Sequence, residues 1–264
     1  MPCRPSHHPF FPVWCPQHIA AVLAGLLLSA PVAAQEIEWG LGLGVASSQT
    51  AYTDMKRDHA ALPMLYVENR HMRFFGTDLE IKLPGLRFSE TQRLDFNLIG
   101  RYDGSGYKAD DAWILNGMAK RKGGIWGGLG VEWQTSLASL QADWTHDLSG
   151  HSKGQRLHLE INRAWQLGER FTLTPRLAAT WHDGNYVDYY YGVRASEVRW
   201  NRPGYHPASA MNTSFGLRGV YRFDQHHTVT LDLQASRLAS AIRDSPLVDR
   251  STVNHLFLGY MYRF

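Results

Sequence analysis

Histidine, serine and acidic residues at short spacings are the first places where this sequence could do chemistry. A hydrolase built on a barrel wall needs a His and a Ser two residues apart on one strand, because only then do both side chains face the same way. No His-x-Ser sequence occurs in the chain. Asp110-Asp111 and His182-Asp183 could serve an aspartate and histidine protease, but solvated loop charges explain both pairs more simply. We therefore predict no catalytic residue and no enzyme activity.

Metal and cofactor chemistry are equally weakly supported. His226 and His227 are adjacent, and adjacent residues of a strand point in opposite directions, so a turn explains them better than a metal site. Both cysteines, Cys3 and Cys15, lie close to the amino terminus, so the rest of the chain cannot build a cysteine-based zinc site or use a thiol nucleophile. The chain has no glycine loop that could cradle phosphate. We predict no metal ion and no cofactor.

The amino-terminal residues 1–34 are typical of a secretory signal peptide. They contain an apolar run over 19–30 and end in the small residues Val32, Ala33 and Ala34, after which we place cleavage. Arg4 is the one Lys or Arg among them, which leaves 26 of the 27 basic residues against 24 Asp and Glu in the exported part. This near-neutral balance gives no support for nucleic-acid binding. We expect one domain over 35–264.

An alternation of apolar and polar residues runs through this exported part. In the last ten residues, 255–264, Leu256, Leu258, Tyr260, Tyr262 and Phe264 share one face of a predicted strand. Similar strands recur, and their length of about ten residues is what a tilted strand needs to cross a bilayer. With 9 Trp, 12 Tyr, 11 Phe and 24 Gly, the composition favours an outer-membrane β-barrel over a soluble sandwich.

We expect an all-β, antiparallel transmembrane β-barrel of the bacterial outer membrane with about 12 strands, within a range of 10 to 12. The twelve predicted strands cover residues 37–45, 62–69, 72–83, 92–102, 124–134, 137–147, 155–165, 170–182, 186–193, 211–223, 227–238 and 253–264. The segment 186–193 is the weakest of them. Residues 46–61, 104–123, 194–210 and 239–252 are the longer connections.

The polar faces of these strands carry charges of both signs that would face the lumen. The candidate lumen charges are Arg93, Asp95, Arg101, Arg156, Glu160, Arg218, Arg222 and Asp232. Charges of both signs favour pairing across a narrow lumen over selection of one kind of ion. Selective conduction remains the alternative.

The connection 104–123 is a candidate contact for a protein partner. Residues 110–122 could form a short helix with an acidic start and a basic end, as the helix dipole favours. The predicted strand count puts this segment on the periplasmic side, where connections are usually short. If it is periplasmic, its partner-contacting residues would be Asp110, Asp111, Trp113, Met118 and Arg121. A capped connector without a partner is the simpler alternative.

Four short motifs, taken in order, resemble the MipA/OmpV family of outer-membrane proteins. They are LNGMAKR at 115–121, YYYGV at 189–193, SPLVD at 245–249 and GYMYRF at 259–264. The resemblance implies an outer-membrane barrel whose final strand, ending in Phe264, is the insertion signal for the barrel-assembly machinery. It further implies a scaffold that bridges a lytic transglycosylase and a murein synthase, although other members are adhesins or stress-responsive envelope proteins.

We therefore expect a non-enzymatic protein of the bacterial outer membrane that links peptidoglycan-remodelling enzymes to that membrane. Its expected partners are outer-membrane lipid, the barrel-assembly machinery, a lytic transglycosylase and a murein synthase, with no nucleic acid. The alternative is a small-solute pore or a surface adhesin.

Overall fold

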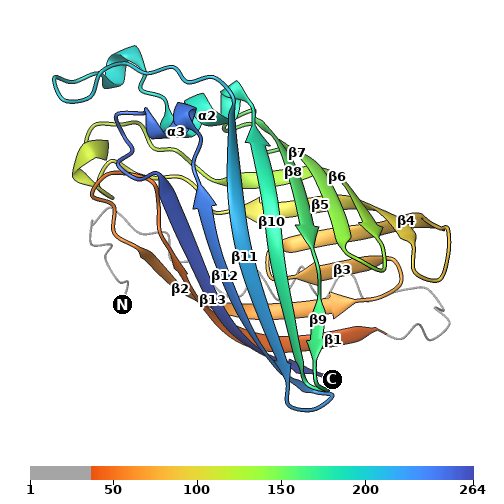
Figure 1. Cartoon of the computed structure of the whole chain (residues 1–264). Helices are drawn as coiled ribbons and strands as arrows, with labels where there is room; N and C mark the ends of the chain where they lie inside the picture. The colour runs from red at the N-terminus through yellow and green to blue at the C-terminus, as the bar shows by residue number, and fades with distance from the viewer. Residues whose placement is uncertain (1–36) are drawn as a thin grey trace, which may run out of the picture. The chain divides into compact units, whose positions relative to one another are not determined.

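A computed structural model describes residues 37–264, and the predicted signal peptide lies outside them. Thirteen strand segments form a single antiparallel sheet (Figure 1). The strands are β1 (Glu38–Ser48), β2 (Asp58–Glu68), β3 (Met72–Phe75), β4 (Asp78–Arg87), β5 (Arg93–Asp103), β6 (Gly124–Gln134), β7 (Ser139–Asp147), β8 (Gln155–Asn162), β9 (Trp165–Leu167), β10 (Phe171–His182), β11 (Ala210–Arg222), β12 (His227–Arg237) and β13 (Thr252–Arg263). The helices are η1 (Trp113–Leu115), α2 (Gly184–Tyr191), η2 (Ala195–Glu197) and α3 (Ser240–Arg243), and none is long and apolar enough to span a membrane.

The sheet closes on itself because β10 pairs with β11 as well as with β8. β8 and β9 pair with successive parts of β10 and act as one strand, so the closed barrel has twelve strands. The break between them lies opposite Pro175, whose ring nitrogen cannot donate a hydrogen bond to the ladder. The predicted fold class is thus confirmed.

The last residue completes the junction between the two ends of the barrel. β13 pairs with β1 from Arg263 beside Gly40 to His255 beside Ser48. Beyond this ladder the Phe264 N–H donates to the Trp39 carbonyl at 3.0 Å, and the two rings stack 3.8 Å apart. A terminal aromatic residue therefore anchors the seam as well as facing outward.

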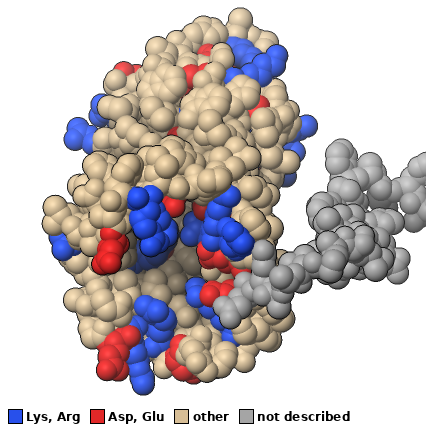
Figure 2. Space-filling view, turned by 90° about the vertical axis from the view of Figure 1, so that its right-hand side faces the viewer, with Lys and Arg blue, Asp and Glu red and all other residues tan. Residues whose placement is uncertain are grey.

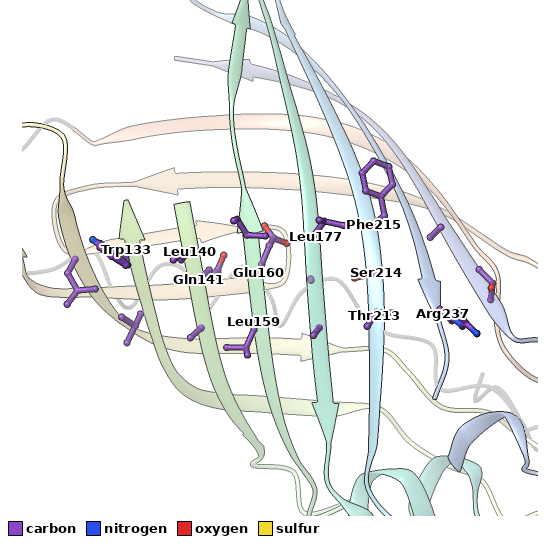
Figure 3. A pocket seen from close by; sticks show the side chains of 18 residues that line it. Trp133, Leu140, Gln141, Leu159, Glu160, Leu177, Thr213, Ser214, Phe215 and Arg237 are labelled. Atoms are coloured by element: carbon purple, nitrogen blue, oxygen red, sulfur yellow. The ribbon is translucent and has the colours of Figure 1, made fainter. Parts of the chain in front are cut away.

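The two faces of the wall differ in side-chain chemistry, as the alternation predicts. On β1 the outward Leu43 is 71 % exposed, whereas the inward Gly42 leaves room for the side chains of Met64 and Met261. A Cβ on Gly42 would clash with the Tyr260 backbone oxygen and lie 2.9 Å from the Met64 methyl carbon, so a larger residue does not fit here without a shift of the backbone. Lys, Arg, Asp and Glu side chains surround a hollow in Figure 2, and an apolar groove crosses the outward wall in Figure 3.

Two of the predicted strands are wrong, and the two errors cancel in the count. Residues 72–83 form two strands, β3 and β4, because Gly76 adopts a positive φ of 62° and reverses the chain. Residues 186–193 are mostly helix α2. The Asp183 side chain accepts a hydrogen bond from the Tyr186 N–H at 2.9 Å and caps the helix, which overrides the strand preference of consecutive tyrosines.

The corrected order of strands changes the position of the connection 104–123. The chain runs up β3 and back down β4 between 72 and 87, so the loops after β1, β5, β7, β10 and β12 all lie at the end opposite the first residue of β1 and Phe264. Short turns occupy the other end. Outer-membrane barrels keep short turns on the periplasmic side and long loops outside. The periplasmic position expected for 104–123 is therefore wrong.

Among residues 37–264, one stretch of β2 has no paired strand on one side. β3 pairs only with Tyr66 to Glu68 of β2, and the Gly76 N–H donates to the Leu65 carbonyl at 3.1 Å. Hydrogen-bonding groups of a strand alternate between its two sides, so Pro63 points to this same edge. Proline has no N–H to leave unsatisfied, which suits it to an unpaired edge.

The facing of β5 gives a direct test of the barrel in a bilayer. Leu98 is outward and 42 % exposed, whereas Asn97 beside it is inward and pairs in register with Gly130. We expect Leu98→Arg to lower the free energy of unfolding by about 2 to 4 kcal/mol, because arginine at mid-membrane is costly. Asn97→Arg should change it by less than about 1 kcal/mol, since the new guanidinium would lie in the lumen. Urea unfolding in lipid vesicles measures both, and equal losses would contradict the assigned facing.

Candidate functional site

A cap built from four loops covers the outer mouth of the barrel. We use this name for residues 49–57, 104–123, 183–209 and 238–251. Two hydrophobic clusters form inside it, one around Val187, Tyr190 and Ile242 and the other around Leu115, Val193 and Leu247. All six side chains are at most 3 % exposed. Loops with such a core are ordered parts of the fold.

The cap reaches down to the top of the barrel wall. Trp126 faces inward near the start of β6 and has no exposed surface, because Tyr186 of α2 lies over it with ring centroids 5.8 Å apart. On the lumen side the Arg156 guanidinium lies 3.8 Å from the centre of the Trp126 ring. Arg156 lies against one side of Trp126, and Tyr186 contacts its ring edge to face, so the cap packs directly on the top of the lumen.

Tyrosine hydroxyls tie the loops of the cap together. Tyr52 donates to the Tyr190 carbonyl at 3.1 Å, and Tyr190 in turn donates to the Lys122 carbonyl at 3.0 Å. Tyr205 donates to the Ala241 carbonyl at 3.0 Å. Each bond joins two different loops, which explains why the cap needs so many tyrosines. Burial raises the pKa of Tyr191 to about 12, so this hydroxyl stays neutral at physiological pH.

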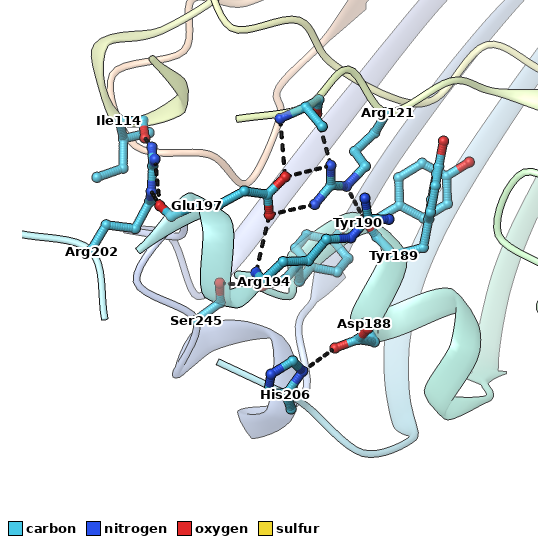
Figure 4. Close-up of polar contacts among 12 residues, drawn as sticks. Ile114, Arg121, Asp188, Tyr189, Tyr190, Arg194, Glu197, Arg202, His206 and Ser245 are labelled. Atoms are coloured by element: carbon cyan, nitrogen blue, oxygen red, sulfur yellow. Dashed lines mark hydrogen bonds and ion pairs between the residues drawn. The ribbon is translucent and has the colours of Figure 1, made fainter. Parts of the chain in front are cut away.

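An ion pair between Arg121 and Glu197 lies at the centre of the cap (Figure 4). The two guanidinium nitrogens donate to the two carboxylate oxygens at 2.9 and 2.8 Å, and the side chains are 1 % and 4 % exposed. Glu197 also accepts the backbone N–H groups of Ala119 and Arg194, both at 3.0 Å. The Arg121 Nε donates to the Tyr189 carbonyl at 2.6 Å. Every strong donor and acceptor of the pair is thus satisfied.

A second arginine, Arg202, holds carbonyl groups of the same region. Its Nη2 donates to the Glu197 carbonyl at 2.7 Å, and its Nη1 donates to the carbonyls of Ile114 and Asn116. Burial lowers the pKa of Arg202, with the charge of Arg199 acting in the same direction. The arginine joins η1 to η2 across about ninety residues of sequence.

These contacts fix where the predicted partner residues lie. Met118 and Arg121 are buried in the cap, whereas Asp110, Asp111 and Trp113 are exposed on it. Asp111 accepts the Lys108 N–H at 2.7 Å and closes a turn in place of the expected longer helix. All five lie at the end of the barrel that carries the long loops, away from the short turns.

Two pairs form within the predicted set of lumen charges, Arg93 with Asp95 and Arg218 with Asp232, and most of the others have partners outside that set. Asp232 accepts from Arg176 at 2.7 Å and from Arg218 at 2.6 Å. The other charges fall into separate contacts: Arg156 pairs with Asp103 at 2.6 Å, Arg101 with Asp78 at 2.9 Å, Arg93 with Asp95 at 2.6 Å, and Glu160 accepts from Asn162 at 3.0 Å. Within residues 37–264, Arg222 makes no ion pair. Sequence reasoning missed Arg176, whose side chain completes the triad around Asp232.

The residues considered for catalysis do not assemble. Asp183 caps α2, while His182 points inward and stacks on Tyr186 with ring centroids 4.3 Å apart. The backbone N–H groups of His226 and His227 both donate to Asp224 at 2.8 Å and form the expected turn. Over the described residues no three His, Asp or Glu side chains come together in a way that could hold a metal ion.

A closed antiparallel barrel with an apolar outer wall, a charged lumen and a loop cap defines an integral outer-membrane protein. The family model for the MltA-interacting protein MipA matches residues 41–264, and the chain belongs to that family. It is 26 % identical over 243 residues to the outer membrane protein OmpV of Vibrio cholerae, covering 87 % of this chain and 91 % of that protein. It is 27 % identical over 243 residues to the MltA-interacting protein of Escherichia coli K12, covering 89 % and 94 %.

Among solved structures, the barrel is similar to a loop L8 deletion mutant of OmpT, an outer membrane protein of Vibrio cholerae. The sequence identity is 8 %, the TM-score is 0.44, and the match covers 88 % of this chain and all of that one.

The central ion pair makes the cap sensitive to acid. Burial raises the pKa of Glu197, but hydrogen bonds from Arg121 and from the backbone N–H groups of Arg194 and Ala119 outweigh burial and hold the pKa below its usual value. A lowered pKa in the folded state stabilises the cap fully above the unfolded pKa of about 4.3, and this stabilisation is lost as the pH falls through the folded value. We expect hydrogen-exchange protection of the Ala119 and Arg194 amides, corrected for intrinsic rates, to fall in that acid range.

Glu197→Gln tests the same pair at neutral pH. It leaves the Arg121 charge buried without a partner, so the free energy of local opening should fall by about 3 to 5 kcal/mol. The barrel should keep its resistance to heat, because no strand is altered. Asp249→Asn is the matched control, since the exposed Asp249 pairs with Arg250 only at 3.7 Å and should contribute little. Equal protection in Glu197→Gln and in the unaltered chain would show that the pair does not hold the cap.

Proposed function

We propose that this protein is a closed, non-enzymatic anchor in the outer membrane that binds a murein enzyme, a lytic transglycosylase, at its periplasmic rim. The main observation that supports this proposal is the cap over the outer mouth. Because the cap covers the outer mouth and the lumen charges are paired, a conducting pore is the less suitable function. The periplasmic end keeps the charged hollow of Figure 2, and a periplasmic protein can reach only that end.

The turns of the periplasmic rim supply the kind of surface that a protein partner needs. The turn between β4 and β5 carries Phe88, which is 63 % exposed, next to Arg87. The turn between β6 and β7 carries Leu137, which is 70 % exposed. Aromatic and arginine side chains are the usual anchors of protein interfaces. The name of the relative from Escherichia coli, MltA-interacting protein, supports the proposed partner class.

Two further contacts belong to the same proposal. A murein synthase would bind to the complex from the periplasm, which the family resemblance supports. The outward residues of the closing strand, Leu256, Leu258, Tyr260, Tyr262 and Phe264, would be read by the barrel-assembly machinery during insertion. Leu256, Leu258, Tyr260 and Phe264 are exposed on the outer wall and Tyr262 is half-buried, which supports this role.

A pair of variants with equal exposure at opposite ends tests the proposal. Phe88 and Trp113 are both 63 % exposed aromatics, one at the periplasmic rim and the other on the cap. We expect Phe88→Glu to weaken capture of a purified lytic transglycosylase at least about tenfold, the loss typical of one interface anchor. Trp113→Glu should leave capture unchanged. Binding is measured with the detergent-solubilised protein immobilised and heat-modifiability checked for each variant.

The opposite outcome would favour a surface adhesin. Trp200 is 95 % exposed on the cap and Trp113 lies exposed on the same end, which is the observation that supports this second function. If Trp113→Glu abolishes binding of cells to a host surface while Phe88→Glu leaves transglycosylase capture intact, the periplasmic anchor is rejected. Loss of capture in both variants would also reject the assignment to one rim.

A further inference from the structure

A groove of about 970 Å³ crosses the outward wall of the barrel from β5 to β13 (Figure 3). Its direction is across the strands rather than along them. It starts near Leu94 and Trp133 at the periplasmic side and ends near Arg237 and Thr252 at the loop side. Since these strands form the membrane-facing wall, the groove opens into the bilayer.

The strand register explains why the wall is hollowed here. Outward residues that are neighbours across the strands form rows, and one row runs through Ala142, Leu159, Ala179 and Thr213. The rows on either side of it are larger. One contains Trp133, Leu140, Ile161, Leu177 and Phe215, and the other contains Leu129, Trp144, Leu157, Trp181 and Met211. In the middle row Ala142, Ala179 and Thr213 are small and Leu159 is the one large residue, so the wall is low on both sides of Leu159 between the two rows of larger side chains.

The loop-side end of this groove is polar and basic. In register, Arg237 lies between Thr213 and Thr252, is exposed, and has no ion-pair partner among the described residues. A second guanidinium is close, because Arg57 donates to the Asn254 side chain at 2.7 Å and Asn254 is the register neighbour of Ala235 in the groove. The groove includes one acidic residue, Glu160, whose carboxylate is engaged with Asn162 on the lumen side.

We propose that this groove is a binding site for a phosphorylated lipid. Its acyl chain would lie along the row from Ala142 to Thr213, and its phosphate would bind Arg237. The apolar part of the groove lies toward the middle of the wall and the basic residue lies at its loop-side end. A lipid has the same arrangement, with its acyl chain in the membrane and its phosphate at the surface. An arginine near the membrane interface costs at most about 1 kcal/mol, because its side chain can reach water or an anionic headgroup. A phosphate satisfies it with charge-assisted hydrogen bonds, and Thr252 adds a hydroxyl donor.

Native mass spectrometry of the full-length mature protein tests the site. The protein is released from micelles that contain dimyristoyl phosphatidic acid or dimyristoyl phosphatidylcholine, which share acyl chains and differ in net headgroup charge. We expect the unaltered protein to retain phosphatidic acid about tenfold more strongly, consistent with one charge-assisted hydrogen bond. Arg237→Gln should remove this preference, and Ala179→Phe should reduce retention of both lipids by filling the groove.

Two matched variants show whether such losses are specific. Arg222→Gln removes an arginine at the periplasmic end of β11, far along the wall from Arg237. Ile81→Phe enlarges an outward residue of β4 that does not line the groove. Both should behave as the unaltered protein, and heat-modifiability confirms that every variant is folded. An undiminished preference in Arg237→Gln, or undiminished retention in Ala179→Phe, would overturn the proposal. If Ala179→Phe instead dissociates a dimer of the protein, the groove holds a second copy and the lipid assignment is wrong.

Discussion

Closure of the backbone hydrogen-bond ladder is the constraint on which the rest of this structure depends. In a bilayer an unpaired N–H or C=O at hydrocarbon depth costs several kcal/mol, so a sheet can span the membrane only if its first and last strands meet. Here β13 pairs with β1 along nine residue pairs, and Phe264 extends the junction past the ladder to Trp39. The alternation of apolar and polar residues has meaning only on a closed wall, because closure separates a lipid side from a lumen side.

The cap follows a different physical principle from the wall beneath it. The wall exposes its leucines to lipid and pairs its charges inside, whereas the cap buries its aliphatic and aromatic side chains as a water-soluble domain does. It achieves this without disulfides, since residues 37–264 contain no cysteine. Backbone carbonyls of one loop accept from tyrosine or arginine of another, so each loop is held by its neighbours. These hydrogen bonds and the Arg121–Glu197 ion pair hold the loops together, as disulfides do in many secreted proteins.

Sequence alone predicted the wall better than the cap, for a physical reason. A period of two residues is a strong signal wherever lipid lies on one side, which is why β5 and β13 were found nearly to the residue. The signal is weak where the surroundings are made by the chain itself. Tyr189 to Tyr191 favour a strand by propensity, yet Asp183 caps a helix there and the cap buries Tyr190. The ion pair could not be found, because Arg121 and Glu197 lie 76 residues apart and no local pattern links them.

The short strand β3 leaves part of the neighbouring strand β2 unpaired on one side. Above the turn at Gly76, β2 pairs with β1 alone among the described residues, so its other edge leaves backbone groups unpaired. Such an edge invites sheet-to-sheet association between copies of a protein. Pro63 removes one donor from this edge and its ring obstructs close approach, which disfavours extension of the ladder by a second barrel. The short β3 and β4 hairpin therefore leaves part of the β2 edge unpaired. Pro63 lowers the number of hydrogen-bond donors that this edge presents to another strand.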